Sequence, residues 1–474
     1  MKALILFPHQ LFVKTLDNYH HIYVEDAYFF NRFPFHKHKL ILHRAGFKSH
    51  FEQNPFSKQY VEYPVDPLFL LNLLQSFEEI YMFDPIEKDL LSSYKSLPIT
   101  IWESPNFLTT RNEITNYFSL KKRYFMNDFY IFQRQRTGIL MSNEKPLGGQ
   151  YSFDEMNRKK LPKNTPFVMF YYTSNEPGLE AAKAWVKQQF PNNPGDVNDF
   201  NYPIDYAGAN TLLEDFLQYK LHDFGPYQDA IDFTDPYQFH SNLSTALNVG
   251  LLSPRTIIDR VLAMDVPLAS KEGFVRQILG WREYVRALYI LEGDRLFESN
   301  ALYHQNKLSD VWFSGVGLPV VDSCIQKMNR FGYLHHIERL MVIGNLMLML
   351  NIHPKEVYRY FSIYFTDAYD WVMIPNIFGM SQFSAEGIMT TKPYFSGSNY
   401  LKKMGAKLGE SAEIWDALFY LFIQDHYEVI QKNPRLSILI GLMDKITDEQ
   451  WMKYRIIKDT WIKKTTVGDY HDKS

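Results

Sequence analysis

The sequence predicts two domains: an α/β N-terminal domain with a parallel, Rossmann-like sheet, and a large all-α C-terminal domain. Three observations support this fold class. The 474 residues exceed what one domain usually holds. Short apolar runs alternate with helical patterns up to about residue 125, and beyond residue 201 apolar residues recur every three or four positions. We therefore expect an α/β domain over 1–125, a connector over 126–200 and a helical domain over 201–474.

Five apolar runs predict the strands of the first domain, at residues 3–7, 21–25, 60–63, 80–83 and 99–102. Helical patterns over 36–51 and 68–77 favour helices that flank a parallel sheet. Ligands of such folds bind beyond the carboxyl ends of the strands. No glycine-rich phosphate motif follows the first run, which argues against a dinucleotide site of the usual kind there.

The connector and the helical domain differ in composition. Residues 134–141 are expected to end a helix, 146–154 are rich in turn-forming residues, and 191–196 have the composition of an exposed loop. Helical spacing is clearest over 210–220, 257–264 and 274–291. We therefore expect the second domain to be helical almost throughout.

Charge and cysteine content exclude several classes. A net charge of −3 excludes a generally basic nucleic-acid-binding protein, so contacts to DNA must use local clusters such as 121–123, 134–136, 158–160, 402–403 and 463–464. Each cluster alone is more often a solvated face. The single cysteine, Cys324, excludes an intrachain disulfide and a cluster held by four cysteinates, and it fits a reducing compartment. No uncharged apolar run reaches about 18 residues, and no signal peptide is recognised. We expect a cytoplasmic monomer with no membrane contact.

One stretch, residues 331–400, concentrates polar groups beside an apolar helix. His335 and His336 precede Arg339, and a helical period places His336 and Arg339 on one face with apolar residues. An isolated histidine there is more often a core residue. Arg339, however, requires an anionic partner if it is buried, and Asp367 and Asp370 are the candidates. Titratable groups against an apolar wall are typical of a catalytic pocket.

The motifs at 333–345, 367–372, 375–376 and 379–383 resemble the photolyase/cryptochrome family, and more narrowly its photolyase-related branch of bacterial (6-4) photolyases, often called iron-sulfur bacterial cryptochromes and photolyases. Segments 148–158, 240–255 and 272–284 resemble further signatures of this family. The resemblance implies an enzyme that binds FAD and uses blue light to repair pyrimidine-pyrimidone (6-4) photoproducts in UV-damaged DNA. It also implies an antenna chromophore, a deazaflavin or a dimethyl-ribityl-lumazine.

The resemblance assigns roles to individual residues. The catalytic proton donors would be His336 with His335 beside it. FAD would contact His240, Ser241, Asn242, Leu243, Ser244, Gln277, Trp281, Arg339, Asn345, Asp367, Tyr369 and Asn376. Electrons would pass through Trp312, Tyr360 and Trp371. The antenna would contact Pro8, His9, Gln10, Leu11 and Glu25. Lesion and DNA would contact Leu340, Met380, Tyr394, Arg158 and Lys392. No metal site is expected.

Two of these segments also have a plain structural interpretation. Ser241 and Ser244 near a helix start are suited to a phosphate, and a simple serine cap fits equally well. Gln277, Trp281 and Tyr284 share one helical face, which suits a planar heterocycle or an ordinary packed core. Only the resemblance favours flavin and DNA contacts.

The chain also departs from the family. Relatives place a cluster cysteine where this chain has Val320, and the segment 405–414 carries none, so no iron-sulfur cluster is expected. Tyr360 and Phe361 stand where relatives often have a Trp-Tyr pair, and Met373 stands where they often have glutamate. The electron supply through the first pair is therefore in doubt.

The first hypothesis is a (6-4) photolyase in which reduced FAD donates an electron to a flipped-out lesion and His336 gives it a proton. A blue-light cryptochrome photoreceptor is the second hypothesis. A third is a cyclobutane dimer photolyase, whose reaction needs no proton donor.

Overall fold

The computed structural model describes residues 2–12, 16–156, 159–162, 165, 177–232, 236–385, 387–391, 393–434 and 436–471. Two of the expected DNA contacts, Arg158 and Lys392, lie outside these residues.

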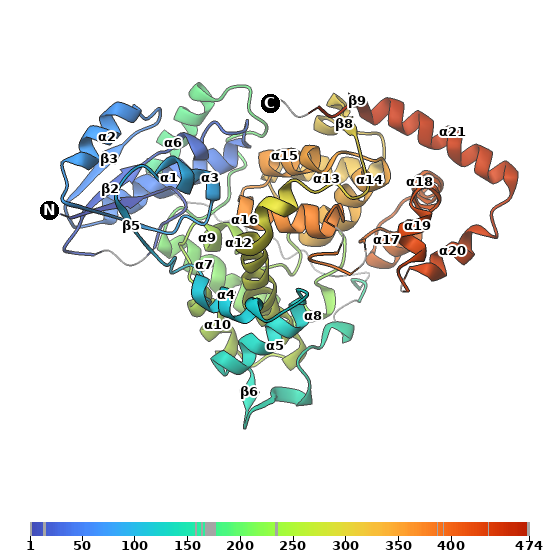
Figure 1. Ribbon diagram of the computed structural model, residues 1–474, viewed down its shortest axis with the longest axis horizontal. Helices are drawn as coiled ribbons and strands as arrows, with labels where there is room; N and C mark the ends of the chain where they lie inside the picture. The colour runs from blue at the N-terminus through green and yellow to red at the C-terminus, as the bar shows by residue number, and fades with distance from the viewer. Residues whose placement is uncertain are drawn as a thin grey trace.

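A five-stranded parallel sheet forms the N-terminal side of the molecule (Figure 1). Its strands are β1 (Lys2–Leu6), β2 (His20–Val24), β3 (Lys58–Val61), β4 (Glu79–Phe83) and β5 (Ile99–Trp102). Their order is β3-β2-β1-β4-β5, and each strand begins within two residues of its expected start. The strands follow the apolar runs because both faces of a parallel sheet are covered. The predicted fold class, a parallel α/β sheet followed by a large helical region, is confirmed.

Helices α1 (Lys37–Gln53), α2 (Pro67–Gln75) and α3 (Lys88–Ser93) connect the strands. The start of α2 follows from local sequence, because the Asp66 carboxylate accepts hydrogen bonds from the first free N–H groups and Pro67 opens the helix. Helix α1 is buried along most of its length, including its polar residues His38, Lys39 and His43. It lies between α6 (Pro177–Gln189) and the helical domain, so these polar side chains meet the second domain.

The expected connector divides between the two sides of the molecule. After α4 (Arg111–Ser119), helix α5 (Met126–Thr137) packs on the helical domain, whereas α6 packs on α1. Between them a short hairpin, β6 (Met141–Ser142) and β7 (Lys145–Pro146), projects from the end of the molecule (Figure 1). The segment 126–200 therefore contributes packed helices to both sides.

The second domain is helical, as expected, apart from a small antiparallel ribbon of β8 (Asn306–Leu308) and β9 (Thr466–Asp469). Its α-helices are α7 (Tyr206–Asp215), α8 (Leu221–Tyr227), α9 (Ser244–Asn248), α10 (Pro254–Ala263), α11 (Leu268–Val275), α12 (Glu283–Phe297), α13 (Pro319–Phe331), α14 (Asn345–Met349), α15 (Pro354–Tyr364), α16 (Asp370–Ile374), α17 (Ser398–Met404), α18 (Ser411–Asp425), α19 (Tyr427–Gln431), α20 (Ser437–Met443) and α21 (Asp448–Thr465). Short 3₁₀ turns occur at Ala27–Phe29, Leu147–Gly149, Asp154–Met156 and Asp310–Phe313. In the described part of the chain, no helix combines the length and apolar character of a membrane span.

Four helices contain a π-helical segment, in which each N–H bonds to the carbonyl five residues back. They are η4 (Phe216–Lys220), η5 (Arg276–Arg282), η7 (Glu338–Gly344) and η8 (Pro375–Ser381). Segment η5 runs into α12, η7 into α14, and η8 continues α16. The last three carry six of the expected site residues, namely Gln277, Trp281, Arg339, Leu340, Asn376 and Met380. π-helical turns occur frequently at functional sites.

Candidate active site

An ion pair anchors the site. Arg339 in η7 meets the carboxylate of Asp367 through two bonds, Nη1 to Oδ1 at 2.9 Å and Nη2 to Oδ2 at 3.1 Å. The Ser244 hydroxyl donates to the same carboxylate at 2.7 Å, and the Arg339 Nε donates to a backbone carbonyl. Burial opposes ionisation of Asp367, but the charge and hydrogen bonds of Arg339 hold its pKa below the ordinary value. Asp367 is thus the anionic partner that the sequence required, and Asp370 is not.

The two adjacent histidines have different surroundings. His336 begins the helix and its side chain is exposed, yet the enclosing protein and then the guanidinium of Arg339 lower its pKa to about 4. His335 is 1% exposed and stacks on His240, with ring centroids 4.5 Å apart. Its Nε2 lies 3.5 Å from a carboxylate oxygen of Glu338 without forming a hydrogen bond. A buried His335 offers little surface to a substrate, so of the expected pair only His336 is exposed.

Three otherwise buried segments, 272–289, 333–350 and 360–385, each keep two side chains at least partly exposed. These six are Gln277, Trp281, His336, Arg339, Val372 and Asn376. The segments adjoin, because η7 packs on η8, and α12 packs on both α16 and η8. Side chains that stay open within a packed core are typical of positions that meet a ligand. Five of the six were expected from the sequence, and Val372 was missed.

The segment 240–245 adds polar atoms without partners. The Asn242 Oδ1 and the Thr245 Oγ1 are buried and accept no hydrogen bond from the described residues. Such orphaned atoms are rare in native interiors, so a polar ligand between them and Ser244 is chemically apt. Ser241 holds its own turn through the N–H of Leu243, and both ring nitrogens of His240 face backbone carbonyls. Thr245 was not anticipated, since nothing in the motif distinguishes it from a core threonine.

Several other expected contacts prove to be internal. Asn345 is fully buried and bonds to the backbone of Ser396. Leu340 and Met380 are only 5% and 3% exposed, so neither presents much surface to a lesion, whereas Tyr394 is partly exposed. Tyr369 is 5% exposed and its hydroxyl is bonded to His43 at 2.8 Å, which assigns it to the domain interface instead of a flavin contact.

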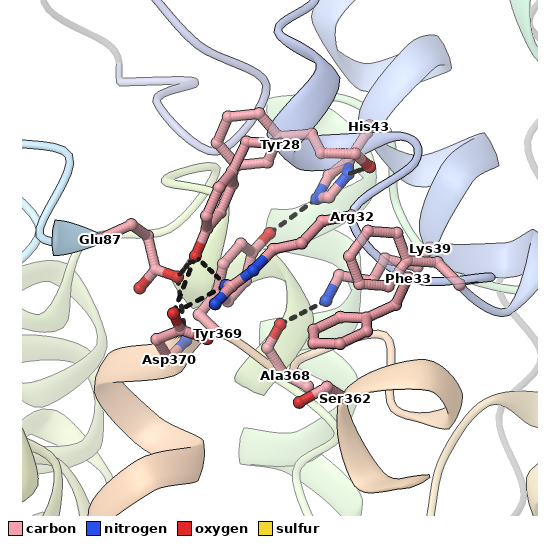
Figure 2. A pocket seen from close by; sticks show the side chains of 12 residues that line it. Tyr28, Arg32, Phe33, Lys39, His43, Glu87, Ser362, Ala368, Tyr369 and Asp370 are labelled. Carbon is pink, nitrogen blue, oxygen red and sulfur yellow. Dashed lines mark hydrogen bonds and ion pairs between the residues drawn. The ribbon is translucent and has the colours of Figure 1, made fainter. Parts of the chain in front are cut away.

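A polar cluster joins the two domains beside Tyr369 (Figure 2). The Glu87 carboxylate accepts the backbone N–H groups of Asp370 at 2.9 Å and Trp371 at 3.3 Å, and it also accepts the hydroxyl of Tyr28. Arg32 donates to the Asp370 carboxylate at 2.7 Å. Burial, and then the charge of Asp370, raise the pKa of Glu87 to about 8. Glu87 therefore caps α16 from the other domain, because the residue before the helix provides no side-chain cap.

The same cluster contains a buried lysine. The Lys39 ammonium donates to the carbonyl of Ala368 and lies 5.0 Å from the centre of the Tyr369 ring. Burial lowers the pKa of Lys39 to about 8. A cavity of about 20 Å³ lies among these side chains, room for about one water molecule. Sequence reasoning missed Glu87, which stands in no recognisable motif, and it assigned no role to Lys39.

The residues expected to hold an antenna chromophore lie inside the protein. Gln10 and His9 bond to the carbonyls of Phe83 and Pro85, at 3.0 and 2.9 Å. Glu25 is fully buried and bonds to Arg44 and to the hydroxyl of Tyr60. Pro8 and Leu11 are buried as well. All five residues are buried in this structure, and His9, Gln10 and Glu25 bond to protein groups.

The residues expected to carry electrons fall into two places. Trp312 and Tyr360 pair at 6.3 Å between ring centroids, and the Tyr360 hydroxyl donates to the Trp312 carbonyl. Trp371 lies apart, edge-on to Phe107 at 5.1 Å and beneath the guanidinium of Arg282. The three residues do not form a continuous chain of the ring contacts described.

Comparison with known proteins identifies the family. Residues 5–202 match the model of deoxyribodipyrimidine photo-lyase-related proteins, and residues 274–408 match the FAD binding domain of DNA photolyase. A (6-4) photolyase of Agrobacterium fabrum is 32% identical over 373 residues, which cover 74% of this chain and 72% of that protein. The chain belongs to the photolyase/cryptochrome family.

Solved structures of the family share the fold. A bacterial class III photolyase from Agrobacterium tumefaciens superposes with a TM-score of 0.57 at 16% identity, covering 89% of this chain and 98% of that one. A cryptochrome from Synechocystis superposes with a TM-score of 0.56 at 14% identity, covering 98% and 99%. A repair enzyme and a cryptochrome thus match this photolyase-family chain about equally, so the fold alone does not separate repair from light sensing.

Proposed function

We propose that this photolyase-family chain is a (6-4) photolyase that repairs UV-damaged DNA in blue light. The observation that carries the proposal is the exposed His336 beside the Arg339–Asp367 ion pair, within an otherwise buried helical core. This arrangement places a proton-carrying ring next to a site with polar and apolar walls.

The residues present fit FAD. Reduced FAD, when bound, supplies the electron that blue light drives into the lesion. Asn242, Ser244 and Thr245 offer the polar atoms for its phosphate and ribose groups, of which two lack protein partners. The partly exposed Gln277 and Asn376 offer amides to the flavin ring system. Arg339, fixed by Asp367, provides a positive charge that favours an anionic, reduced cofactor.

The proposed role of His336 is to give a proton to the oxygen group that the lesion must transfer. With its pKa near 4 in the protein alone, the ring is neutral at physiological pH. An anionic cofactor and a DNA phosphate would both raise the pKa, since opposite charges favour the protonated ring. We therefore propose that His336 gains its proton only in the complex with substrate.

The test is blue-light repair by the protein with chemically reduced FAD, using one oligonucleotide with a single (6-4) lesion and another with a cyclobutane dimer. Conversion of the (6-4) substrate alone, lost in His336→Ala while FAD stays bound, is the expected result. His222→Ala, which removes an exposed histidine elsewhere, is the control and should repair normally. Full repair by His336→Ala would exclude the proton-donor role, and conversion of neither substrate would favour a photoreceptor.

A further inference from the structure

The Trp312–Tyr360 pair is poorly suited to carry electrons from a reductant in solution to the flavin. Trp312 is fully buried beneath the C-terminal segment, and its ring N–H donates to the Thr465 carbonyl at 2.9 Å. The Tyr360 hydroxyl donates to a backbone carbonyl, which is too weak a base to take the proton that an oxidised phenol must lose. The next residue, Phe361, has no hydroxyl at all.

A second set of aromatic residues leads from the proposed flavin site to the surface. Trp281, one of the six open side chains, lies edge-on to Tyr284 with ring centroids 6.2 Å apart. Tyr284 is fully buried and lies 6.5 Å from Phe118, which lies 5.3 Å from Tyr124. Burial, then the nearby phenols of Tyr124 and Tyr117, raise the pKa of Tyr284, so these hydroxyls share one neighbourhood.

Tyr124 ends this set beside a base. Its hydroxyl donates to a carboxylate oxygen of Glu292 at 2.7 Å, and both side chains are partly exposed. Burial, and then this hydrogen bond, raise the pKa of Tyr124 to about 12, so the phenol holds its proton at neutral pH. A carboxylate within hydrogen-bond distance can take that proton when the phenol is oxidised. Among the described residues, the hydroxyl of Tyr284 has only the Met389 carbonyl as an acceptor, at 3.5 Å, and no carboxylate.

We propose that Trp281, Tyr284 and Tyr124 form the route by which bound FAD is reduced in the light, with Glu292 as the proton acceptor. This inference rests on the proposed function, in which FAD contacts Gln277, a partly exposed residue of the same helical segment as Trp281. Trp281 loses one electron to light-excited oxidised FAD, and the electron is replaced from Tyr124 by way of Tyr284. Tyr124 then passes its phenolic proton to Glu292 and becomes a neutral radical. A thiol in solution would return one electron and one proton to Tyr124, and the proton on Glu292 would leave to solvent. Each round supplies one electron, so two rounds supply the two electrons of fully reduced FAD and leave two thiols joined as a disulfide.

The route has a surface that suits an external reductant. Lys121, Lys122 and Arg123 precede Tyr124 directly and are exposed. Their positive charge attracts thiolates and other anionic reductants to the point where the radical forms.

The experiment illuminates the protein with oxidised FAD and dithiothreitol, and follows flavin reduction by absorbance and the tyrosyl radical by electron paramagnetic resonance. Tyr124→Phe is expected to slow flavin reduction by about tenfold or more and to abolish the radical signal. Glu292→Gln keeps an acceptor for the hydroxyl while removing the base, and should slow the reaction in the same direction. Tyr117→Phe removes a neighbouring phenol and serves as the control, with an unchanged rate.

Two outcomes would overturn the route: a normal rate in Tyr124→Phe, or a loss that appears in Tyr360→Phe instead. Repair of a (6-4) oligonucleotide after chemical reduction separates this inference from the proposed function. Tyr124→Phe should then repair as well as the unaltered protein. Absence of repair by the unaltered, reduced protein would overturn the proposed function without touching the route, and failure to bind FAD would overturn both.

Discussion

Replacing Glu87 by glutamine tests whether a carboxyl group of one domain caps a helix of the other. Glu87 is 1% exposed and accepts bonds from Tyr28, from the N–H of Asp370 and from the N–H of Trp371. A glutamine has one oxygen in place of two, so its amide would face a backbone donor. Leaving a buried donor unmatched costs about 1–3 kcal/mol of the free energy of unfolding.

The charge of Glu87 gives this variant a pH dependence with a definite sign. Its pKa is raised from 4.5 to about 8 in the folded protein, so the folded state binds the proton more tightly than the unfolded state. The stabilisation is complete below pH 4.5 and is lost as the pH rises towards about 8. Each pH unit in that window corresponds to about 1.4 kcal/mol, so two units correspond to about 3 kcal/mol. The glutamine side chain does not titrate, so the Glu87→Gln variant escapes this loss.

The assay is urea unfolding of both proteins between about pH 5 and about pH 7, followed by circular dichroism. Burial lowers the pKa of several histidines to about 3 or 4, so their protonation in the unfolded state also changes the stability below about pH 6.5. The informative quantity is therefore the difference in unfolding free energy between the two proteins. Glu87→Gln should be the less stable protein at about pH 5, and should gain about 3 kcal/mol relative to the parent by about pH 7. Asp89→Asn, in which the lost carboxylate is exposed, should show a difference of about 1 kcal/mol or less at every pH. If the difference in unfolding free energy between Glu87→Gln and the parent stays the same from about pH 5 to about pH 7, the raised pKa of Glu87 is refuted.

Two further substitutions test the candidate site. Asp367→Asn leaves Arg339 without its charged partner in a largely buried place, which should cost about 3–5 kcal/mol of unfolding free energy by urea titration; a cost below about 1 kcal/mol would show that solvent screens this pair. Gly344→Ala would place a Cβ 2.3 Å from the hydroxyl oxygen of Ser381, so we expect a loss of about 1–3 kcal/mol. Gly178→Ala meets no atom within 4 Å and should leave stability unchanged or raise it by up to about 1 kcal/mol.

Sequence was informative where the chain obeys local rules. The strands were located because apolar runs end at proline and at polar clusters, and both faces of the sheet are buried. The need of Arg339 for a carboxylate follows from the cost of burying a lone charge, and Asp367 meets it. The first argument uses only the local sequence of each strand. The second uses only the rule that a buried arginine needs an anionic partner.

Contacts between distant segments carried no such signal. Glu87 caps a helix almost three hundred positions later in the chain, and nothing near it in sequence marks a cap (Figure 2). His335 is buried where it stacks against His240. The motif contains both His335 and His336, and nothing in it tells the buried histidine from the exposed one. The hydrogen bonds of the expected antenna residues were equally hidden from the sequence, since the partners of Glu25 and Gln10 come from other strands and loops.

The π-helical segments explain why the predicted helix faces were only partly right. A turn closed by i to i+5 bonds contains more residues than an α-turn, so a residue seven positions along no longer returns to the same face. Gln277 and Trp281 stay open together, whereas Tyr284, which an α-helix would align with them, turns into the core. That rotation directs Tyr284 towards the aromatic residues of α4 and the segment before α5, and so creates the ring contacts between Trp281 and the surface. In a regular α-helix Tyr284 would share the face of Gln277 and Trp281 and would lie open beside them.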